Sequence, residues 1–499
     1  MKNIFKFIYA CLMLSIVSCN DAIEIEQPGR LGAENAFQSV SDLRAGLLGA
    51  YNFLDTTNEI GLTAAMTDES HRGKDNGGQN NDEQNFNINS SNGYVSGIWG
   101  SNYGAIGMAN RVIQAAASID ASEDQAEYNN VLGQAHAIRA FAHFQILTYF
   151  SPDYTDDSAL AGILVTSPAE DIFEARPRST NGEFYTQISA DLQIASDLIN
   201  ASEGVTFMGA DFVTALRARM SAYRGDYAMA DTYAASLLVD YPIATKAQYT
   251  AMFEDTDFTE VIFSLERSIG DSYDNQGTEG GGWAGSLFAF IDATASGGPF
   301  MEMSRSVYNL LAGTDDVRLS RNLNQDESTI DPTYETNDNY LNDDVLLVFK
   351  YPGGTQPLLN DLKVFRSSEM LFIRAEASAD ANDLASAAAF LNQLRDARYG
   401  SAQSEYSFTT QEEAFKGILD ERRLELLFEG HRWVDLKRLG EKATIIVDNQ
   451  PVKTEISRDA KECENLAGCS LPNSDYRFTL PIPLSETTAN SGVDQNDGY

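Results

Sequence analysis

The densest group of potentially reactive side chains lies in one short stretch, LFEGHRWVDLKRLG, between Leu427 and Gly440. It places carboxylates, a histidine and guanidinium groups within a dozen or so positions, and general acid–base catalysis uses these residue types. The same composition is also typical of the charged end of a helix. Whether these side chains meet a substrate or one another therefore depends on the elements that carry them.

Their spacing favours ion pairs. On a helix, three pairs of opposite charges would lie three positions apart, which is close enough for them to meet. The pairs are Arg422 with Glu425, Glu429 with Arg432, and Asp435 with Arg438. Interleaved leucine and aromatic side chains would bury much of the segment, so its charges need partners rather than substrates. We interpret the stretch as a structural ladder of ion pairs, because catalysis would also need a cleft and a base with a shifted pKa.

Metal and cofactor patterns are weak in this sequence. The four histidines do not cluster with the cysteines. The acidic run NDNYLNDD, residues 337–344, contains the ligand types of Ca²⁺ but lacks the spacing of an EF-hand loop. The glycine-rich run GTEGGGWAGS lacks the closing Gly-Lys-Ser/Thr of a phosphate-binding loop. We expect no cofactor and no metal, with structural Ca²⁺ as a weak alternative.

The chain is long and strongly acidic. Its 499 residues, 43% of them hydrophobic, can bury a large core, and its formal net charge is -38. This charge repels phosphate polymers and anionic lipid headgroups at long range. The sequence therefore disfavours nucleic acid as a partner, and it favours a neutral polysaccharide over a polyanionic one.

The first eighteen residues have the features of a secretory signal. Lysines precede an apolar run from Phe7 to Val17, which is too short to span a bilayer. The run ends in IVSC, similar to a bacterial lipobox, in which a small residue precedes the lipidated cysteine. We expect residues 1–18 to be removed, Cys19 to carry lipid, and residues 19–35 to form a tether to the membrane. The alternative is an ordinary signal with an unmodified cysteine.

Two cysteines remain once Cys11 and Cys19 are assigned to the signal and the lipid. They are Cys463 and Cys469, in CENLAGC. In an exported protein, two thiols this close most simply form a disulfide. Two free thiols remain the alternative, because spacing alone does not show that the side chains converge.

Helical periodicity dominates the chain from residue 36 onward. Apolar residues three and four apart predict helices over 36–54, 102–119, 125–150, 180–200, 211–224, 226–239, 367–380, 382–398 and 411–430. Helix pairs near 127–200, 211–240 and 368–400 have the small residues and short turns of tetratricopeptide units, which must stack to bury their apolar faces. We predict a mainly α fold, a single domain over 36–499 with a scaffold of such pairs.

Two long insertions interrupt this scaffold. Residues 67–97 are polar and rich in glycine and asparagine, whereas residues 255–365 combine two β-like runs, EVIFSLE and DVLLVFKY, with glycine-rich and acidic loops. Loops this long in a compact protein are usually functional or mobile. We expect any ligand site in this irregular, loop-rich half.

Five stretches spread along the chain share a recognisable order of residues. They are the lipobox, WGSNYGAIGMANRVI, RSSEMLFIRAEA, ILDERRLELLFEGHRWVDLKRLG and FTLPIPLSETTANSGVDQNDGY. Together they resemble the SusD/RagB family of outer-membrane lipoproteins, over essentially the whole mature chain. The departures are Asp497, where members often have proline, and a count of only three tryptophans.

The resemblance implies a fold and a role. The fold is a tetratricopeptide-like scaffold with a loop-rich half that contains the binding face. The role is that of a surface-exposed glycan-binding lipoprotein, without catalytic activity, which passes oligosaccharides to a SusC-like TonB-dependent transporter in the outer membrane. Two alternatives stay open: uptake of oligopeptides, as in the RagB branch, and a lipid-anchored glycoside hydrolase with paired carboxylates.

Glycan sites combine an exposed aromatic platform with planar polar groups. Trp283, in EGGGWAG, has few neighbouring side chains to pack on, so we expect it to be exposed as a platform; burial by a distant element is the alternative. Tyr273 is the second platform candidate. The resemblance places the 67–97 loop near ligand and transporter, and the loop offers Lys74, Asn80 and Gln84 as polar candidates. From it we predict Arg72, Asn81 and Asp82 as polar ligands, unless the loop is merely solvated.

Overall fold

The computed structural model describes residues 36–122, 124–168, 174–271, 282–288, 298–354 and 356–499. The predicted signal, the tether with Cys19, and Tyr273 lie outside the described residues. Within these ranges, no helix combines the length and apolar character needed to cross a bilayer.

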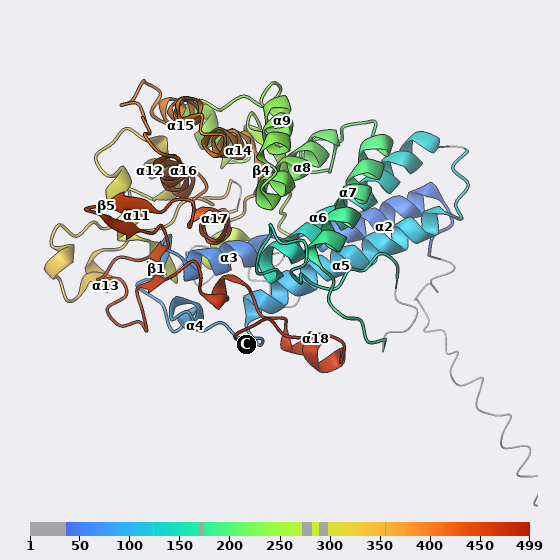
Figure 1. The fold of residues 1–499 in the computed structure, drawn as a ribbon, viewed down its shortest axis with the longest axis horizontal. Helices are drawn as coiled ribbons and strands as arrows, with labels where there is room; N and C mark the ends of the chain where they lie inside the picture. Colours follow the sequence, from blue (N-terminus) through green and yellow to red (C-terminus); the bar gives the residue numbers. More distant parts are fainter. Residues whose placement is uncertain (1–35, 123, 169–173, 272–281, 289–297, 355) are drawn as a thin grey trace, which may run out of the picture.

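Helix pairs form the scaffold, as predicted. α6 (Gln125–Phe150) packs on α7 (Asn181–Leu198), α8 (Ala210–Arg224) on α9 (Tyr227–Leu237), and α14 (Ser367–Asp380) on α15 (Leu384–Tyr399). α14 also contacts α9 and α16 (Gln411–Glu425), while α2 (Val40–Asn52) and α5 (Gly93–Ala116) pack beside α6. Figure 1 shows these helices side by side, with α2, α5, α6 and α7 at one end and α14, α15 and α16 at the other. The fold is mainly helical. Its largest core cluster runs through α2 and α5 to α9, whereas α14, α15 and α16 enclose a second cluster.

Small residues and turn residues explain why the pairs form. Ala230 and Ala375 are fully buried, and their lack of bulk lets neighbouring helices approach closely. Gly225 ends α8 in the left-handed region, at φ 83°, where a side chain would be strained. Asp226 then caps α9 by accepting a hydrogen bond from the Met229 amide at 3.3 Å. The sequence between α8 and α9 therefore specifies a tight helical hairpin.

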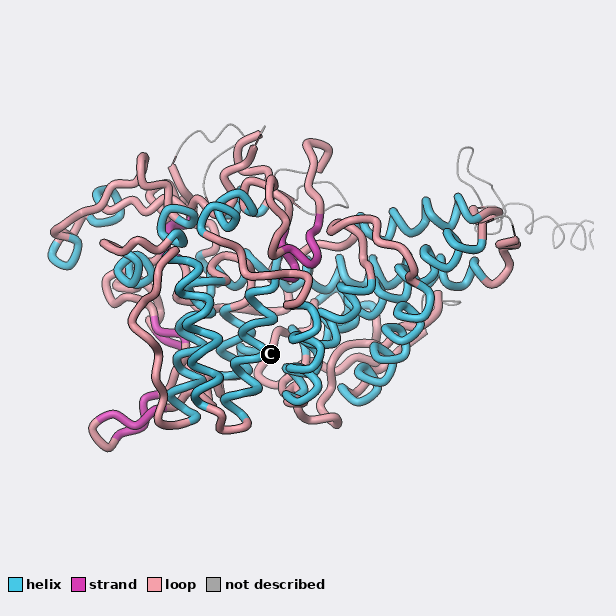
Figure 2. Tube along the Cα trace, turned by 90° about the horizontal axis from the view of Figure 1, so that it is seen from above, coloured by secondary structure: helices cyan, strands magenta, loops and turns pink. Residues whose placement is uncertain are grey.

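Short helices fill the loop-rich half, which lies towards the left and upper edge in Figure 2. The α-helices not yet named are α3 (Thr57–Met66), α4 (Asn81–Gln84), α10 (Lys246–Met252), α11 (Arg305–Leu311), α12 (Val317–Asn322), α13 (Tyr340–Asp343), α17 (Arg432–Leu439) and α18 (Leu484–Ala489). The 3-10 helices are η2 (Ala284–Leu287), η3 (Tyr334–Thr336) and η4 (Tyr476–Phe478).

Four two-stranded antiparallel sheets complete the described fold. Their pairings are β1 (Ser70–Arg72) with β3 (Met301–Met303), β2 (Val261–Leu265) with β4 (Leu362–Arg366), β5 (Ile445–Val447) with β6 (Gln450–Val452), and β7 (Ile456–Ser457) with β8 (Ser470–Leu471). The β-like run EVIFSLE contains β2. The run DVLLVFKY, in contrast, forms only isolated bridges, from Val345 to Thr329 and from Val348 to Leu323.

Two differences from the expected boundaries affect the candidate sites. The 67–97 segment is not wholly loop, because it contains β1, α4 and the first turn of α5, which begins at Gly93. The helix expected over 411–430 ends at Glu425. Phe428 and Gly430 then have φ values of 62° and 85°, which turn the chain before α17 begins at Arg432. The charged stretch therefore spans two helices and a turn.

Candidate functional site

The charges of the LFEGHRWVDLKRLG stretch are structural, but most of their partners are distant in sequence. Of the three expected pairs, Asp435 and Arg438 meet, at 3.2 Å. Arg432 instead binds both carboxylate oxygens of Asp68, each at 2.9 Å. Glu429 pairs with Arg366 in β4, at 2.8 Å. The turn at Phe428 and Gly430 explains this difference, since it takes Glu429 and Arg432 off a common helix.

A buried network of four charges lies next to this stretch. Arg398 binds Glu260 at 2.7 Å and Glu425 at 2.8 Å, and Arg366 binds the same two carboxylates at 3.0 and 2.9 Å. Burial alone would raise the pKa of Glu425, but the guanidinium groups of Arg398 and Arg366 hold it well below its usual range. Each carboxylate is paired, so this network joins β4, α15, α16 and Glu260, the residue before β2, and presents no group to a substrate.

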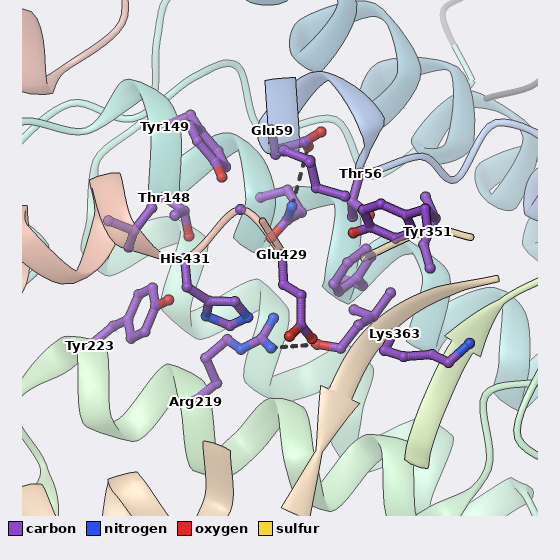
Figure 3. A pocket seen from close by; sticks show the side chains of 17 residues that line it. Thr56, Glu59, Thr148, Tyr149, Arg219, Tyr223, Tyr351, Lys363, Glu429 and His431 are labelled. Carbon is purple, nitrogen blue, oxygen red and sulfur yellow. Dashed lines mark hydrogen bonds between the residues drawn. The ribbon is translucent and has the colours of Figure 1, made fainter. Parts of the chain in front are cut away.

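The cavity beside this network is small. Its volume is about 50 Å³, which is room for a few water molecules but not for a sugar ring. Figure 3 shows Glu59 at its top and His431 and Arg219 below. Burial and the nearby Asp55 charge raise the pKa of Glu59 to about 8, and burial lowers the pKa of His431 to about 4. The cavity is therefore an internal polar void.

The loop-rich face brings together the predicted polar residues. The Arg72 guanidinium donates from Nε to Gln84 Oε1 at 3.0 Å and from Nη2 to Asn81 Oδ1 at 2.5 Å. Asn81 and Asp82 are exposed on α4, and Arg72 is half-buried at the end of β1. One guanidinium, one amide and one carboxylate thus share a small exposed area, which is a suitable set for binding hydroxyl groups.

Local structure holds this group in place. Arg72 lies opposite Met301 in the β1–β3 pair. Asn80 precedes α4 in the left-handed region, at φ 55°, and its Oδ1 accepts a hydrogen bond from the Tyr94 hydroxyl at 2.8 Å. The buried Glu302 carboxylate accepts from the Lys74 amide at 2.6 Å. The turn between β1 and α4 is therefore fixed by residues more than two hundred positions away.

Asn80, Gln84 and Tyr94 also support the site. Asn80 and Gln84 belong to the polar candidates of the 67–97 segment, and Gln84 lies three positions after Asn81 in the run NDEQ, where both would share one face of a helical turn. Nothing in the sequence pointed to Tyr94.

Trp283 does not form an exposed platform in this structure, contrary to expectation. It is 4% exposed, and its indole Nε1 donates to the Ser268 carbonyl at 3.3 Å. The flanking glycines permit close backbone approach instead of freeing the ring: a Cβ on Gly285 would lie 2.6 Å from Leu358. The carbonyl of Gly282, next to Trp283, accepts a hydrogen bond from the Thr57 hydroxyl at the start of α3. Arg72 lies instead in β1, which follows the end of that helix. Trp283 and Arg72 are therefore not brought together.

Other candidate ligand groups are accounted for within the described residues. Cys463 and Cys469 form a disulfide, with Cα atoms 5.4 Å apart. In the acidic run 337–344, the Asp343 carboxylate accepts from the amides of Asn337 and Asn339 at 3.0 and 3.1 Å. Across the described ranges, no three His, Cys, Asp or Glu side chains are grouped so that they could hold a metal ion.

Two family models match the chain. Residues 350–499 match one described as the SusD family, and residues 35–208 match one described as starch-binding, associating with the outer membrane. Two curated relatives come from Formosa agariphila. SusD-like protein P2 is 26% identical over 99% of both chains, and SusD-like protein P38 is 24% identical over 89% of this chain and 93% of its own.

Solved structures show the same fold. A SusD superfamily protein from Bacteroides thetaiotaomicron matches with a TM-score of 0.72 and 22% identity, covering 92% of this chain and 99% of that one. A SusD-like carbohydrate binding protein from Bacteroides vulgatus matches with a TM-score of 0.71 and 22% identity, covering 92% and 98%. With relatives aligned over nearly its full length and models matched in both its first and last thirds, the chain belongs to the SusD/RagB family of binding proteins.

Proposed function

We propose that this protein is a cell-surface glycan-binding lipoprotein that captures oligosaccharides and delivers them to a SusC-like TonB-dependent transporter. One observation carries the proposal: the chain matches, in sequence and fold, a family of non-catalytic binding proteins, one of whose models is described as starch-binding and associating with the outer membrane. The buried pairing of the charged stretch is consistent with binding without catalysis.

The loop-rich face supports the proposed binding role. Arg72, Asn81 and Asp82 supply donors and acceptors that sugar hydroxyls can use, and hydrogen bonds already hold Arg72 and Asn81 in one geometry. A fixed group loses little conformational entropy when ligand binds. The formal charge of -38 favours an uncharged glycan at such an exposed position. Tyr273, outside the described residues, remains a candidate aromatic platform for this face.

Anchoring is proposed to occur through Cys19. Residues 1–18 would direct export, and residues 19–35 would connect the lipid to the domain that begins at residue 36. Each buried methylene of an acyl chain contributes about 0.8 kcal/mol, so two or three chains hold an acidic protein on a surface that would otherwise repel it.

Calorimetric titration of residues 20–499 with a panel of neutral oligosaccharides tests the binding role. We expect Arg72→Ala and Asn81→Ala each to weaken binding about fivefold or more, the effect of losing roughly one hydrogen bond. Asp82→Ala should act similarly. Asp240→Ala, which removes an exposed carboxylate three residues after the end of α9, is the charge-matched control for Asp82→Ala and should bind normally.

The other outcomes identify other functions. Binding of oligopeptides with no response to any glycan would replace the proposal with peptide uptake. Release of reducing ends from polysaccharide would replace it with hydrolysis. Delivery to a transporter is tested by mild detergent extraction of the lipidated protein, and purification without any TonB-dependent barrel would refute that part.

A further inference from the structure

A second concave region lies where the last thirty residues pack on the scaffold. It has a volume of about 250 Å³ and is distinct from the Arg72 group. Its lining consists of two apolar residues, one aromatic and five polar side chains: Pro152, Leu160, Tyr476, Arg178, Thr479, Gln495, Asn496 and Asp497. The volume lies just below the range for drug-sized ligands, so it suits one sugar ring rather than an oligomer.

The Tyr476 ring is held by its neighbours but remains partly exposed to solvent. It is 45% exposed and belongs to η4. Gly498, at φ 93°, packs so closely on it that a Cβ there would lie 2.3 Å from the ring. The Tyr499 ring meets it edge-on, at 5.0 Å and 76°. A rigid ring with an open side is what stacking on the apolar face of a sugar requires.

The polar groups of the pocket are equally fixed. Arg178 is 9% exposed, and its hydrogen bonds all go to main-chain carbonyls: Ala161 at 2.7 Å, Leu160 at 2.6 Å, Phe150 at 3.1 Å and Asp494 at 3.4 Å. The bond to Asp494 is long and is made by Nη1, so this nitrogen keeps donor capacity.

Asn496 supplies the matching acceptor. Its buried amide nitrogen donates to the carbonyls of Phe150 and Leu480, at 3.0 and 2.7 Å, which leaves Oδ1 to accept. Asp497, exposed at the rim, adds a carboxylate. One donor, two acceptors and one ring thus converge on a single small pocket.

We propose that this pocket is a second glycan-binding site, which holds one pyranose ring of a neutral glycan between Tyr476, Arg178, Asn496 and Asp497. This inference rests on the proposed glycan-binding function. Adjacent sugar hydroxyls would accept from Arg178 and donate to Asn496 and Asp497 while the ring stacks on Tyr476. Asp494 and Asp497 disfavour a sulfated or uronic sugar at the same place.

The segments that carry the two proposed glycan sites contact each other. Arg477, next to Tyr476, donates to the Phe86 carbonyl at 3.1 Å, two residues after α4 ends. The Leu484 amide donates to the Ser90 carbonyl at 2.8 Å. Figure 1 shows the end of the chain between α4 and α18. Two weak sites on one edge of a protein favour retention of a polymer over a monosaccharide.

Titration of residues 20–499 with maltoheptaose, laminariheptaose and a sulfated carrageenan hexasaccharide tests the inference. We expect the Arg72→Ala, Asn81→Ala double variant to retain residual binding of a neutral probe, and addition of Tyr476→Ala to abolish it. Tyr476→Ala and Asp497→Ala alone should each weaken binding about threefold or more. Phe258→Ala, at a ring that is 42% exposed elsewhere, is the matched control and should bind normally.

The outcomes separate this inference from the proposed function. If Tyr476→Ala and Asp497→Ala bind neutral probes as the wild type does, the second site is refuted while the glycan-binding function stands. If the wild type binds none of the three probes, both fail. Binding of only the sulfated probe refutes the neutral-sugar assignment. Asp497 is exposed, so Asp497→Ala keeps the test decisive even if Tyr476→Ala unfolds.

Discussion

Arg432→Ala tests the conclusion that the charged stretch is structural. Arg432 is 5% exposed and holds both oxygens of Asp68 at 2.9 Å, while its Nη1 reaches the Leu419 carbonyl at 3.3 Å. Asp68, itself buried, has a second cation in Arg423, at 3.2 Å. The substitution therefore leaves a buried carboxylate with one of its two charged partners.

The expected cost follows from this geometry. Removing one partner of a buried ion pair costs about 3–5 kcal/mol, and the remaining Arg423 places the loss at the lower end, about 3 kcal/mol. Burial alone would raise the pKa of Asp68, but the two guanidinium groups lower it overall. A carboxyl with a lowered pKa stabilises the fold above its ordinary pKa near 4, and this contribution is lost as pH falls through the lowered value. The stability lost in Arg432→Ala should thus be largest at pH 7 and smaller in acid.

Urea unfolding followed by far-UV circular dichroism measures this loss. The matched control is Arg374→Ala, which breaks a salt bridge to Asp231. The side chains of this pair are 30% and 40% exposed, so the substitution should cost under about 1 kcal/mol. The reasoning is refuted if Arg432→Ala unfolds within about 1 kcal/mol of the wild type, or if a well-folded variant loses glycan binding altogether.

Three further predictions concern other sites. Replacing both Cys463 and Cys469 by serine should cost about 2 kcal/mol through loss of a short cross-link, and thiol titration of denatured residues 20–499 should find no free thiol; two reactive thiols would contradict the disulfide. In the folded protein Glu59 keeps its proton up to a pH of about 8, whereas the unfolded chain releases it near 4.3. The free energy of unfolding therefore falls as pH rises between these two values. Glu59→Gln should therefore gain stability relative to the wild type between pH 5 and 8 in urea titrations, and parallel profiles would contradict this. Cys19→Ser should abolish labelling by palmitate and release the protein from membranes, and a labelled variant would disprove lipidation at that residue.

The scaffold could be predicted because most helices of the pairs have one apolar face. α7 and α15 fall within two residues of their expected bounds, since the apolar period and the caps both mark them. α6 also has its expected bounds, although residues 133–150 are buried on all sides, because its length and its cap at Asp124 mark it. α3 gave no such signal, because it is buried on nearly all sides and contains no polar stripe. The strand β4 is likewise buried throughout. An element enclosed on every side has no periodic pattern to find.

The candidate site was harder to predict for a different reason. Arg72 and Asn81 meet because the turn between them is held by β3, which is remote in sequence. Glycines around Trp283 fit either an exposed ring or a tightly packed one, and only the tertiary fold decides. The left-handed φ of Phe428, which separates α16 from α17, is not a conformation that phenylalanine suggests.

The bond between Asp68 and Arg432 also constrains the order of assembly. The two residues are separated by 364 positions, so a chain emerging amino end first waits for most of its length before this bond can close. Such non-local closure slows folding. We expect the chain to stay incompletely folded while it is being translocated, because it can complete its native fold only after its final quarter has emerged.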